Sequence, residues 1–360
     1  KEVPFKNVYF TGIVRDKQRR KMSKSLGNSP DPIELIEKYG ADGVRVGILL
    51  SSAAGNDLLF DEELMLQGRN FATKIWNAYR LVQGWNKDET IKANEADRQA
   101  IDWFGHQMDK TIAEVADQFE KFRISDALHL LYKLIWDDFC SWYLEAIKPG
   151  YGEPVSKEVY DQTILYFEEL MKLIHPFMPF LSEELWQNIA ERTPENALVI
   201  AQQRKPETFN QDLIKNFDSA KELISGIRNY RQSKGISSRE SVELFTNATA
   251  FENENLIKKL ANVAEVNLGQ KTDKPSFTFL VGSIEISIPL SENLDLTEEK
   301  VKTEEEINYL KGFLVSVEKK LSNEKFVANA KPEVVEAERK KQKDAQDKIA
   351  LLEAKLSTLS

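Results

Sequence analysis

A short basic loop between a predicted strand and a predicted helix constrains the fold of this chain more than any other feature. Residues 15–25 carry six basic side chains and one acidic side chain, a net charge of +5. The whole chain of 360 residues has a formal net charge of −9, so the loop stands out against an acidic background. Closely spaced ammonium groups, hydroxyls and loop amides are typical of phosphate binding.

The flanks of this loop predict an α/β arrangement. Residues 7–14 form a β-branched and aromatic run, which predicts a buried strand. Pro30-Asp31-Pro32 ends the loop, and Pro32 suits the first turn of a helix that Gly40 would end. A strand, a loop and a helix in this order place a ligand at the edge of an α/β sheet. An ordinary solvated basic turn is the alternative that charge alone leaves open.

The rest of the chain predicts mainly helices. Residues 44–50 are β-prone and predict a second strand. Periodic apolar residues predict a helix over 61–83, and then a bundle of four helices over 96–119, 125–147, 159–174 and 182–189. A smaller α/β part follows, with strands over 197–200, 242–245, 263–268, 277–281 and 283–288 and helices over 212–232 and 252–261. The fold class is therefore mostly α.

The final stretch has heavy charge and a repeating apolar seam. Apolar residues step by 3 and 4 along two arms, separated by a break that contains Pro332. They are Ile307, Leu310, Leu314, Val317 and Leu321 in the first arm and Ala345, Ile349, Leu352, Leu356 and Leu359 in the second. This pattern predicts an antiparallel coiled-coil hairpin. A dimerisation or spacer hairpin with solvated charges is the alternative.

Composition narrows the class of protein. No apolar run approaches the ~20 residues that span a bilayer, and there is no signal peptide, so we expect a cytoplasmic protein without a membrane partner. Cys140 is the only cysteine, which excludes an intrachain disulfide and a zinc site built on cysteines. His106, His129 and His175 lack metal-ligand spacing, so we expect no metal site in this chain.

Residues 21–25 read Lys-Met-Ser-Lys-Ser, and this string resembles the second signature of the class I aminoacyl-tRNA synthetases. Asp31-Pro32 and residues 39–45 extend the resemblance, and residues 55–57 and 68–77 narrow it to the valyl branch. The earlier His-x-Gly-His signature of the class is not found in the sequence. We therefore expect the C-terminal part of a longer enzyme, inactive by itself, whose catalytic fold is Rossmann-like.

The resemblance implies a role for each residue of the string. Lys24 would stabilise the β- and γ-phosphates of ATP as pyrophosphate leaves, and Lys21 would assist it. Ser23 and Ser25 would position the loop, and Met22 belongs to the same ATP-binding string. The cofactor would be ATP, with Mg²⁺ expected at the complete active site. The full-length enzyme would be a monomeric ligase that activates valine and transfers it to tRNA(Val).

The resemblance also divides the chain into five parts. These are the end of the catalytic domain with a stem-contact region (1–60), a connecting helix (61–94), an anticodon-binding helix bundle (95–205), a small α/β junction (206–293) and a tRNA-binding coiled-coil hairpin (294–360). Residues 321–327 would form the tip of that hairpin. The expected tRNA contacts are Arg69, Lys74, Lys121, Arg123, Arg228, Arg231, Lys319, Lys320, Arg339, Lys340, Lys341 and Lys343.

The aromatic residues of the bundle have two interpretations, base stacking and core packing. Trp136, Phe139 and Tyr143 recur at helical spacing, which favours packing. We expect the same for Phe177, Met178 and Phe180. For the whole chain two other functions remain open: a noncatalytic tRNA-binding protein derived from a synthetase, and an isoleucyl or leucyl relative. The intact signature loop favours a ligase, because a pure binder has no need of Lys24.

Overall fold

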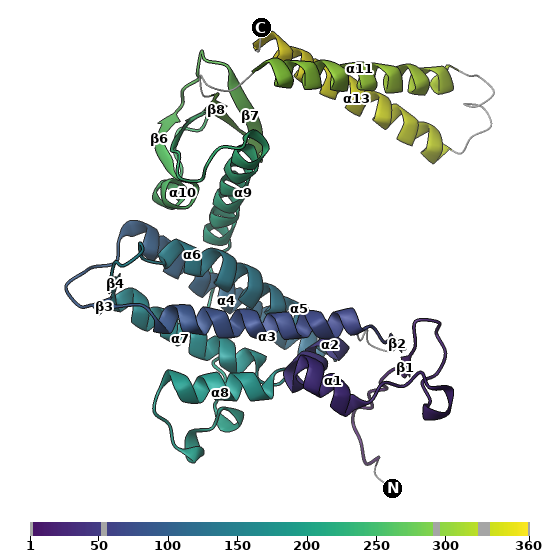
Figure 1. Cartoon of the computed structure of the whole chain (residues 1–360), viewed down its shortest axis with the longest axis vertical. Helices are drawn as coiled ribbons and strands as arrows, with labels where there is room; N and C mark the ends of the chain where they lie inside the picture. Colours follow the sequence, from purple (N-terminus) through teal and green to yellow (C-terminus); the bar gives the residue numbers. More distant parts are fainter. Residues whose placement is uncertain (1–2, 52–55, 291–295, 323–331, 359–360) are drawn as a thin grey trace. The chain divides into compact units, whose positions relative to one another are not determined.

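The computed structural model describes residues 3–51, 56–290, 296–322 and 332–358, and it is mostly helical (Figure 1). The chain divides into two compact units, one of residues 1–221 with 252–260 and one of residues 222–251 with 261–360. Among the described residues, no helix is both long enough and apolar enough to cross a membrane.

The first strand is much shorter than the sequence predicts. β1 (Val14–Arg15) pairs in parallel with β2 (Leu58–Leu59), and residues 7–13 have no regular structure. Val8 is 68% exposed and Phe10 is 80% exposed, so the prediction of a buried strand over 7–14 is wrong. A parallel strand is buried only where neighbours cover its faces, and the described chain offers only a two-residue partner.

The helix after the loop is confirmed. α1 (Pro32–Tyr39) has Pro32 in its first turn, and the Asp31 carboxylate caps it by accepting the Ile33 backbone N–H at 2.7 Å. Gly40 ends α1 with a φ of +77°, a conformation that favours glycine. Leu35 and Tyr39 are buried, whereas Ile33 and Ile36 lie exposed.

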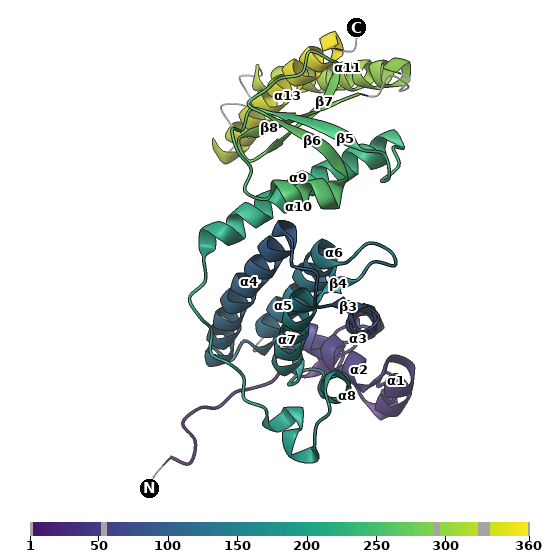
Figure 2. The same ribbon diagram turned by 90° about the vertical axis from the view of Figure 1, so that its left-hand side faces the viewer.

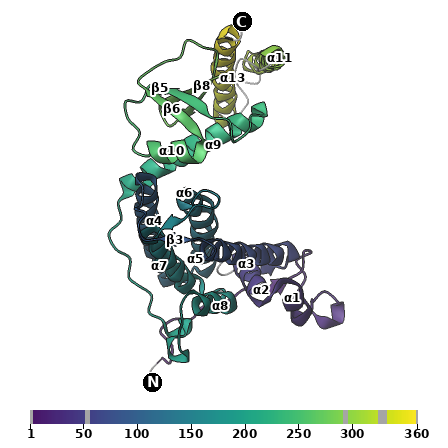
Figure 3. The ribbon, with the colours of Figure 1, turned by 60° about the vertical axis from the view of Figure 1, so that its left-hand side comes forward.

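The second predicted strand, over 44–50, is wrong, because this segment forms α2 (Ala41–Leu50). α2 lies directly against α3 (Glu62–Gln83), as Figure 3 shows. A Cβ on Gly68 would clash with the Gly43 carbonyl, and a Cβ on Gly47 would lie 2.7 Å from the Leu64 carbonyl oxygen. Close helix packing through these glycines overrides the strand preference of the valines and isoleucine.

Helices are present at each of the four places that the sequence predicts between residues 95 and 189. The bundle contains α4 (Glu95–Glu120), α5 (Ile124–Lys133), a π-helix η2 (Leu134–Tyr143), α6 (Leu144–Ile147), α7 (Lys157–Ile174) and α8 (Pro179–Ile189). A short parallel pair, β3 (Lys87–Asp88) with β4 (Val155–Ser156), closes one end. The single helix predicted over 125–147 is thus interrupted by the π-helix, in which the Ser141 hydroxyl donates to the Trp136 carbonyl at 2.9 Å.

The core interpretation of the bundle aromatics is confirmed for most of them. Phe139 is 1% exposed and Tyr143 is fully buried, while Trp136 is half-buried. Phe177 and Met178 are buried as well. Phe180 is the exception at 65% exposed, because it stands in the first turn of α8, where its backbone N–H rather than its ring contacts the fold.

Residues 197–200 are not a strand. They form a 3₁₀ turn, η4 (Leu198–Ile200), which follows a similar turn η3 (Pro194–Asn196). The Leu198 backbone N–H donates to the Glu183 carboxylate at 2.9 Å, and the Trp186 indole N–H donates to the Asn196 carbonyl at 2.8 Å. These two hydrogen bonds attach the segment to α8. They give its backbone N–H and carbonyl groups partners that a neighbouring strand would otherwise supply.

The helices and strands predicted from residue 212 onward are present up to residue 289. The helices are α9 (Gln211–Lys234) and α10 (Glu254–Ala261), and the strands form one sheet in the order β6-β5-β8-β7. Its strands are β5 (Val242–Thr246), β6 (Val263–Leu268), β7 (Ser276–Val281) and β8 (Ile284–Pro289), and β5 and β6 are parallel. Figure 2 shows α9 beside the sheet. Tyr230 stacks on Phe277 with ring centroids 4.9 Å apart, and Gly226 leaves room for Phe279.

The last two helices, α11 (Leu296–Leu321) and α13 (Pro332–Thr358), lie side by side (Figure 1). Their order is antiparallel, because Glu306 pairs with Lys348 whereas Lys320 pairs with Glu338. The predicted seam is confirmed by burial at Ile307, Val317, Ala345, Ile349 and Leu352. Most of the predicted tip, residues 323–327, and Leu359 lie outside the described residues.

Candidate functional site

Three of the six basic side chains in the loop are neutralised by carboxylates. Two of these carboxylates come from residues more than forty positions away. The ion pairs are Arg15 with Asp57, Lys17 with Asp61 at 3.1 Å, and Arg20 with Asp16 at 2.7 Å. Arg19, Lys21 and Lys24 are exposed, and within the described part of the chain none of their side chains has an ion pair. The loop therefore presents three uncompensated cations.

The segment 21–28 has a defined backbone. Lys24 begins a 3₁₀ turn, η1 (Lys24–Leu26), which Gly27 ends with a φ of +62°. The hydroxyls of Ser23 and Ser25 lie 2.7 Å apart and hydrogen-bond to each other. Met22 and Ser23 are half-buried, whereas Lys24 and Ser25 are exposed. The middle of the string, at Met22 and Ser23, is thus packed against the fold, and its end, at Lys24 and Ser25, is accessible to solvent.

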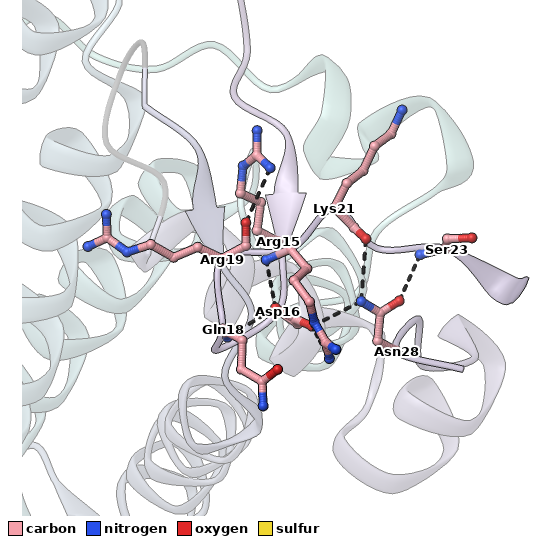
Figure 4. Close-up of polar contacts among 8 residues, drawn as sticks. Arg15, Asp16, Gln18, Arg19, Lys21, Ser23 and Asn28 are labelled. Carbon is pink, nitrogen blue, oxygen red and sulfur yellow. Dashed lines mark hydrogen bonds and ion pairs between the residues drawn. The ribbon is translucent and has the colours of Figure 1, made fainter. Parts of the chain in front are cut away.

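Asn28 folds back onto the string and joins it to Asp16 (Figure 4). Its amide oxygen accepts the Ser23 backbone N–H at 2.9 Å. Its amide nitrogen donates to the Asp16 carboxylate at 3.0 Å and to the Lys21 carbonyl at 3.3 Å. We call Asp16 and Asn28, with these bonds, the Asp16–Asn28 latch.

The Asp16 carboxylate accepts three further hydrogen bonds. They come from the backbone N–H groups of Gln18 at 3.0 Å and Arg20 at 2.8 Å, and from the Arg20 guanidinium at 2.7 Å. The hydrogen bond from Asn28 is the main cause that lowers the pKa of Asp16 to about 2, and the bonds from Arg20 add to it. Asp16 therefore stays ionised at neutral pH and holds the turn closed.

The Lys21 side chain points away from the latch. In Figure 4 the Lys21 side chain extends from the backbone on the side opposite the Asn28 amide. An open hollow of about 550 Å³ lies beside the latch, lined among others by Asp16, Arg20, Asn28 and Phe60. Neither Lys21 nor Lys24 lines this hollow. Both lysines are exposed to solvent.

The carboxylates in and beside the loop do not fit a magnesium site. Magnesium prefers oxygen ligands from carboxylates and phosphates. Asp16, Asp57 and Asp61 each face a basic side chain instead. Across the described residues, no group of three or more His, Cys, Asp or Glu side chains could hold a metal ion.

The candidate tRNA contacts of the first unit are mostly at the surface. Arg69 is exposed and donates to the Lys38 carbonyl at 3.4 Å, and Lys121 is exposed and pairs with Asp117 at 2.6 Å. Arg123 is exposed. Lys74 is half-buried, with its ammonium 5.6 Å from the centre of the Trp136 ring, so it has a packing role as well.

Arg228 is exposed near the end of α9, but Arg231 is not available to RNA. Arg231 is 5% exposed. Its guanidinium donates to four backbone carbonyls, those of Ser237, Glu240, Ala261 and Asn262. Arg231 therefore ties the turn after α9 to the end of α10, and its place among the expected tRNA contacts is corrected. A basic residue at a helix end looks the same in sequence whether it faces solvent or caps a loop.

The candidate contacts of the hairpin also divide into paired and unpaired groups. Lys320 and Lys341 lie 3.8 Å and 2.9 Å from the buried Glu338. Lys319, Arg339 and Lys343 are exposed, and none has an ion pair with a described residue. The side chain of Lys340 lies outside the described residues.

The latch is the structural element of the loop that the sequence does not predict. Asp16 was visible as the one acid in a basic run, and Asn28 as the residue after a glycine. Nothing in their spacing shows that their side chains meet.

Comparison with known proteins gives three family matches along the chain. Residues 1–61 match tRNA synthetases class I (I, L, M and V), residues 102–246 match the anticodon-binding domain of tRNA ligase, and residues 295–360 match the valyl tRNA synthetase tRNA binding arm. Valine–tRNA ligase of Christiangramia forsetii is 52% identical over 366 residues, which cover 100% of this chain and 41% of that protein. Valine–tRNA ligase of Phocaeicola vulgatus is 51% identical over 361 residues, which cover 99% of this chain and 41% of that protein.

The chain thus spans about two fifths of the length of these curated relatives. The three matches cover the basic loop, the helix bundle and the coiled-coil hairpin, and each is to a family model of tRNA synthetases or tRNA ligases. The chain belongs to the class I aminoacyl-tRNA synthetases, in the branch of the valine–tRNA ligases.

Proposed function

We propose that this chain supplies the ATP-phosphate loop and much of the tRNA-binding surface of a valine–tRNA ligase. In that reaction valine and ATP form valyl-adenylate and pyrophosphate, and the valyl group then passes to tRNA(Val). The observation that carries the proposal is the pair Lys21 and Lys24. Both are exposed and have no ion pair within the described chain, although three of the other four basic residues of the loop are neutralised.

The chemistry needs such a pair. As the carboxylate of valine attacks the α-phosphate, the bond to pyrophosphate breaks and negative charge grows on the departing oxygens. Ammonium groups placed at that charge lower the barrier, because they interact more strongly with the transition state than with bound ATP. Lys24 would stabilise the β- and γ-phosphates, Lys21 would assist it, and the Ser23 and Ser25 hydroxyls would orient the turn between them.

The remaining parts would grip tRNA(Val). Residues 1–60 would complete a Rossmann-like catalytic domain, residues 61–94 would connect it to the anticodon-binding bundle of residues 95–205, and residues 206–293 would join the bundle to the hairpin of residues 294–360. The exposed cations on the bundle and the hairpin would contact phosphates, which position RNA without reading its sequence. We propose a cytoplasmic monomer. Magnesium would arrive with the phosphates of ATP rather than on this chain's carboxylates.

Substitution of Lys24 in the full-length ligase tests the proposal. Lys24→Ala should slow valine-dependent ATP–pyrophosphate exchange about 10²–10³-fold, the range for removing one preorganised group at a developing charge. Affinity for tRNA(Val) should stay the same. The matched control is Lys17→Ala, because Lys17 belongs to the same loop but is paired with Asp61. Equal exchange rates for the Lys24→Ala variant and the wild type would refute the phosphate role of this loop.

A further inference from the structure

We infer that Asp16 and Asn28 are positioning residues for the adenylation reaction: the latch holds Lys21 and Lys24 in the geometry that binds the departing pyrophosphate. The inference rests on the proposed function of the loop. It concerns two residues that touch neither ATP nor valine in the proposed mechanism and act only through the lysines.

The first argument is the bonding pattern of the Asn28 amide. It bonds the Lys21 carbonyl and the Ser23 N–H, the two backbone groups on either side of Met22. In a parallel sheet, one residue of a neighbouring strand makes this same pair of bonds. A single side chain thus supports the extended backbone that leads to Ser23, beyond the point where Lys21 is bridged to Arg15 of β1. Extended backbone at residues 21–23 sets the direction from which Lys21 and the turn at Lys24 leave the loop.

The second argument is the position of the Asp16 charge. A carboxylate close to a triphosphate is repulsive unless its charge is compensated. The Asp16 side chain is 13% exposed, it accepts hydrogen bonds from Gln18, Arg20 and Asn28, and it pairs with Arg20. The negative charge of Asp16 is therefore compensated by groups of the loop itself, while the unpaired positive charges of Lys21 and Lys24 are exposed to solvent. This separation explains why a phosphate-binding loop can contain an acid.

The third argument is preorganisation. Lysine side chains are flexible point charges, so their effect at a transition state depends on how firmly the backbone beneath them is held. The latch holds the string at its beginning, through Lys21 and Ser23, and leaves Lys24 and Ser25 accessible. Without it, the loop would have to become ordered during each turnover, which lowers kcat for adenylation.

Three single variants of the full-length ligase test the inference. Asn28→Ala and Asp16→Ala should each lower kcat for ATP–pyrophosphate exchange about 10- to 100-fold and leave KM for valine unchanged. The double variant should be no slower than the slower single variant, because both changes break one unit. Gln18→Ala is the matched control, since only the backbone of Gln18 bonds to Asp16. It should stay within about twofold of the wild type.

Asn28→Asp provides a readout that a merely structural role would not produce. At neutral pH this substitution places a second carboxylate beside Asp16. The new carboxylate should repel the Asp16 carboxylate, and it lacks the N–H group with which Asn28 donates to Asp16. Two adjacent carboxylates raise the pKa of one of them. As the pH falls toward 5, the shared proton should restore a donor, and kcat relative to wild type should recover.

The outcomes separate the inference from the proposed function. If Lys24→Ala leaves exchange unchanged, the proposed function fails and the inference fails with it. If Lys24→Ala is slow but Asn28→Ala matches Gln18→Ala, the inference alone fails. A loss of activity in Asn28→Ala that follows a loss of folded protein in circular dichroism, with no acid recovery in Asn28→Asp, would also overturn it.

Discussion

The basic loop and the coiled-coil hairpin both present lysines and arginines at the surface, but they are held in place by different forces. The loop is held by hydrogen bonds and ion pairs around Asp16 and Asn28. The hairpin is held by an apolar seam, with Ile307 5% exposed and Val317 2% exposed. In each region carboxylates neutralise some cations and leave others unpaired.

This difference indicates two ways to use charge. In the proposed function the loop would need two ammonium groups at defined positions, and directional hydrogen bonds supply that precision but depend on a few atoms. The hairpin would need only a charged surface of roughly correct shape, and a seam of many apolar contacts tolerates variation in any one charge. Single substitutions should therefore act on chemistry in the loop and on stability or RNA affinity in the hairpin.

The largest expected effect after the loop variants is on the seam. Ile307→Ala should destabilise the hairpin by about 3 kcal/mol, because it leaves a cavity between α11 and α13. Hydrogen exchange of the backbone amides in α11 measures this change. The matched control is Tyr309→Ala, since Tyr309 is on the same helix but 72% exposed.

The same measurement made on the loop sharpens the contrast. Leu26 is 63% exposed, so Leu26→Ala should change amide exchange of residues 21–28 little. A strong effect of Leu26→Ala, or a weak effect of Ile307→Ala, would contradict the assignment of different forces to the two regions.

An intermediate effect is expected from the unpaired cations of the hairpin. Joint replacement of Lys319, Arg339 and Lys343 by Ala should weaken tRNA binding and reduce the salt slope of log K by about 3, about 1 for each lost phosphate contact. Pyrophosphate exchange should not change. The control replaces Lys311 and Lys348, which pair with Glu353 at 2.6 Å and Glu306 at 2.9 Å. The opposite outcome is that the control lowers the salt slope by as much per substituted residue as the triple replacement does. That result would show that ion pairing within the hairpin does not determine which cations contact RNA.

The smallest effect concerns pH. The pKa of Asp16 is lowered to about 2, and that of Glu338 is lowered chiefly by its hydrogen bond from Lys341. Both carboxylates therefore contribute stability above their ordinary pKa values, and the contribution is lost as the pH falls through the folded pKa. Carbon-detected NMR should find Asp16 still ionised at pH 3.

Two variants extend the pH comparison between the regions. Asn28→Ala should raise the titration midpoint of Asp16 and leave that of Glu338 unchanged, because it removes the main hydrogen bond that lowers the Asp16 pKa. Lys341→Ala should do the reverse. A shift of both midpoints by either substitution would show that the two regions are not independent.

Much of the fold could be predicted from local patterns. The helix that begins at Pro32 and the helix expected over 61–83 are present in the structure, and the seam of the hairpin follows from its heptad steps. Local sequence patterns could not show that residues 7–14 and 44–50 do not form the predicted strands. The first depends on neighbouring strands, and the second on the close approach of Gly43 and Gly68 across two helices.

The sequence by itself determined the family, the helical periodicity and the number of charges in the basic loop, because these are properties of residue type and spacing. Only the tertiary structure decided which charges remain available. Arg15 is paired with a residue 42 positions away, and Arg231 is buried under four carbonyls. Lys21 and Lys24 stay unpaired within the described chain. The physical reason is that a charged side chain becomes paired, buried or exposed according to the groups that folding brings beside it.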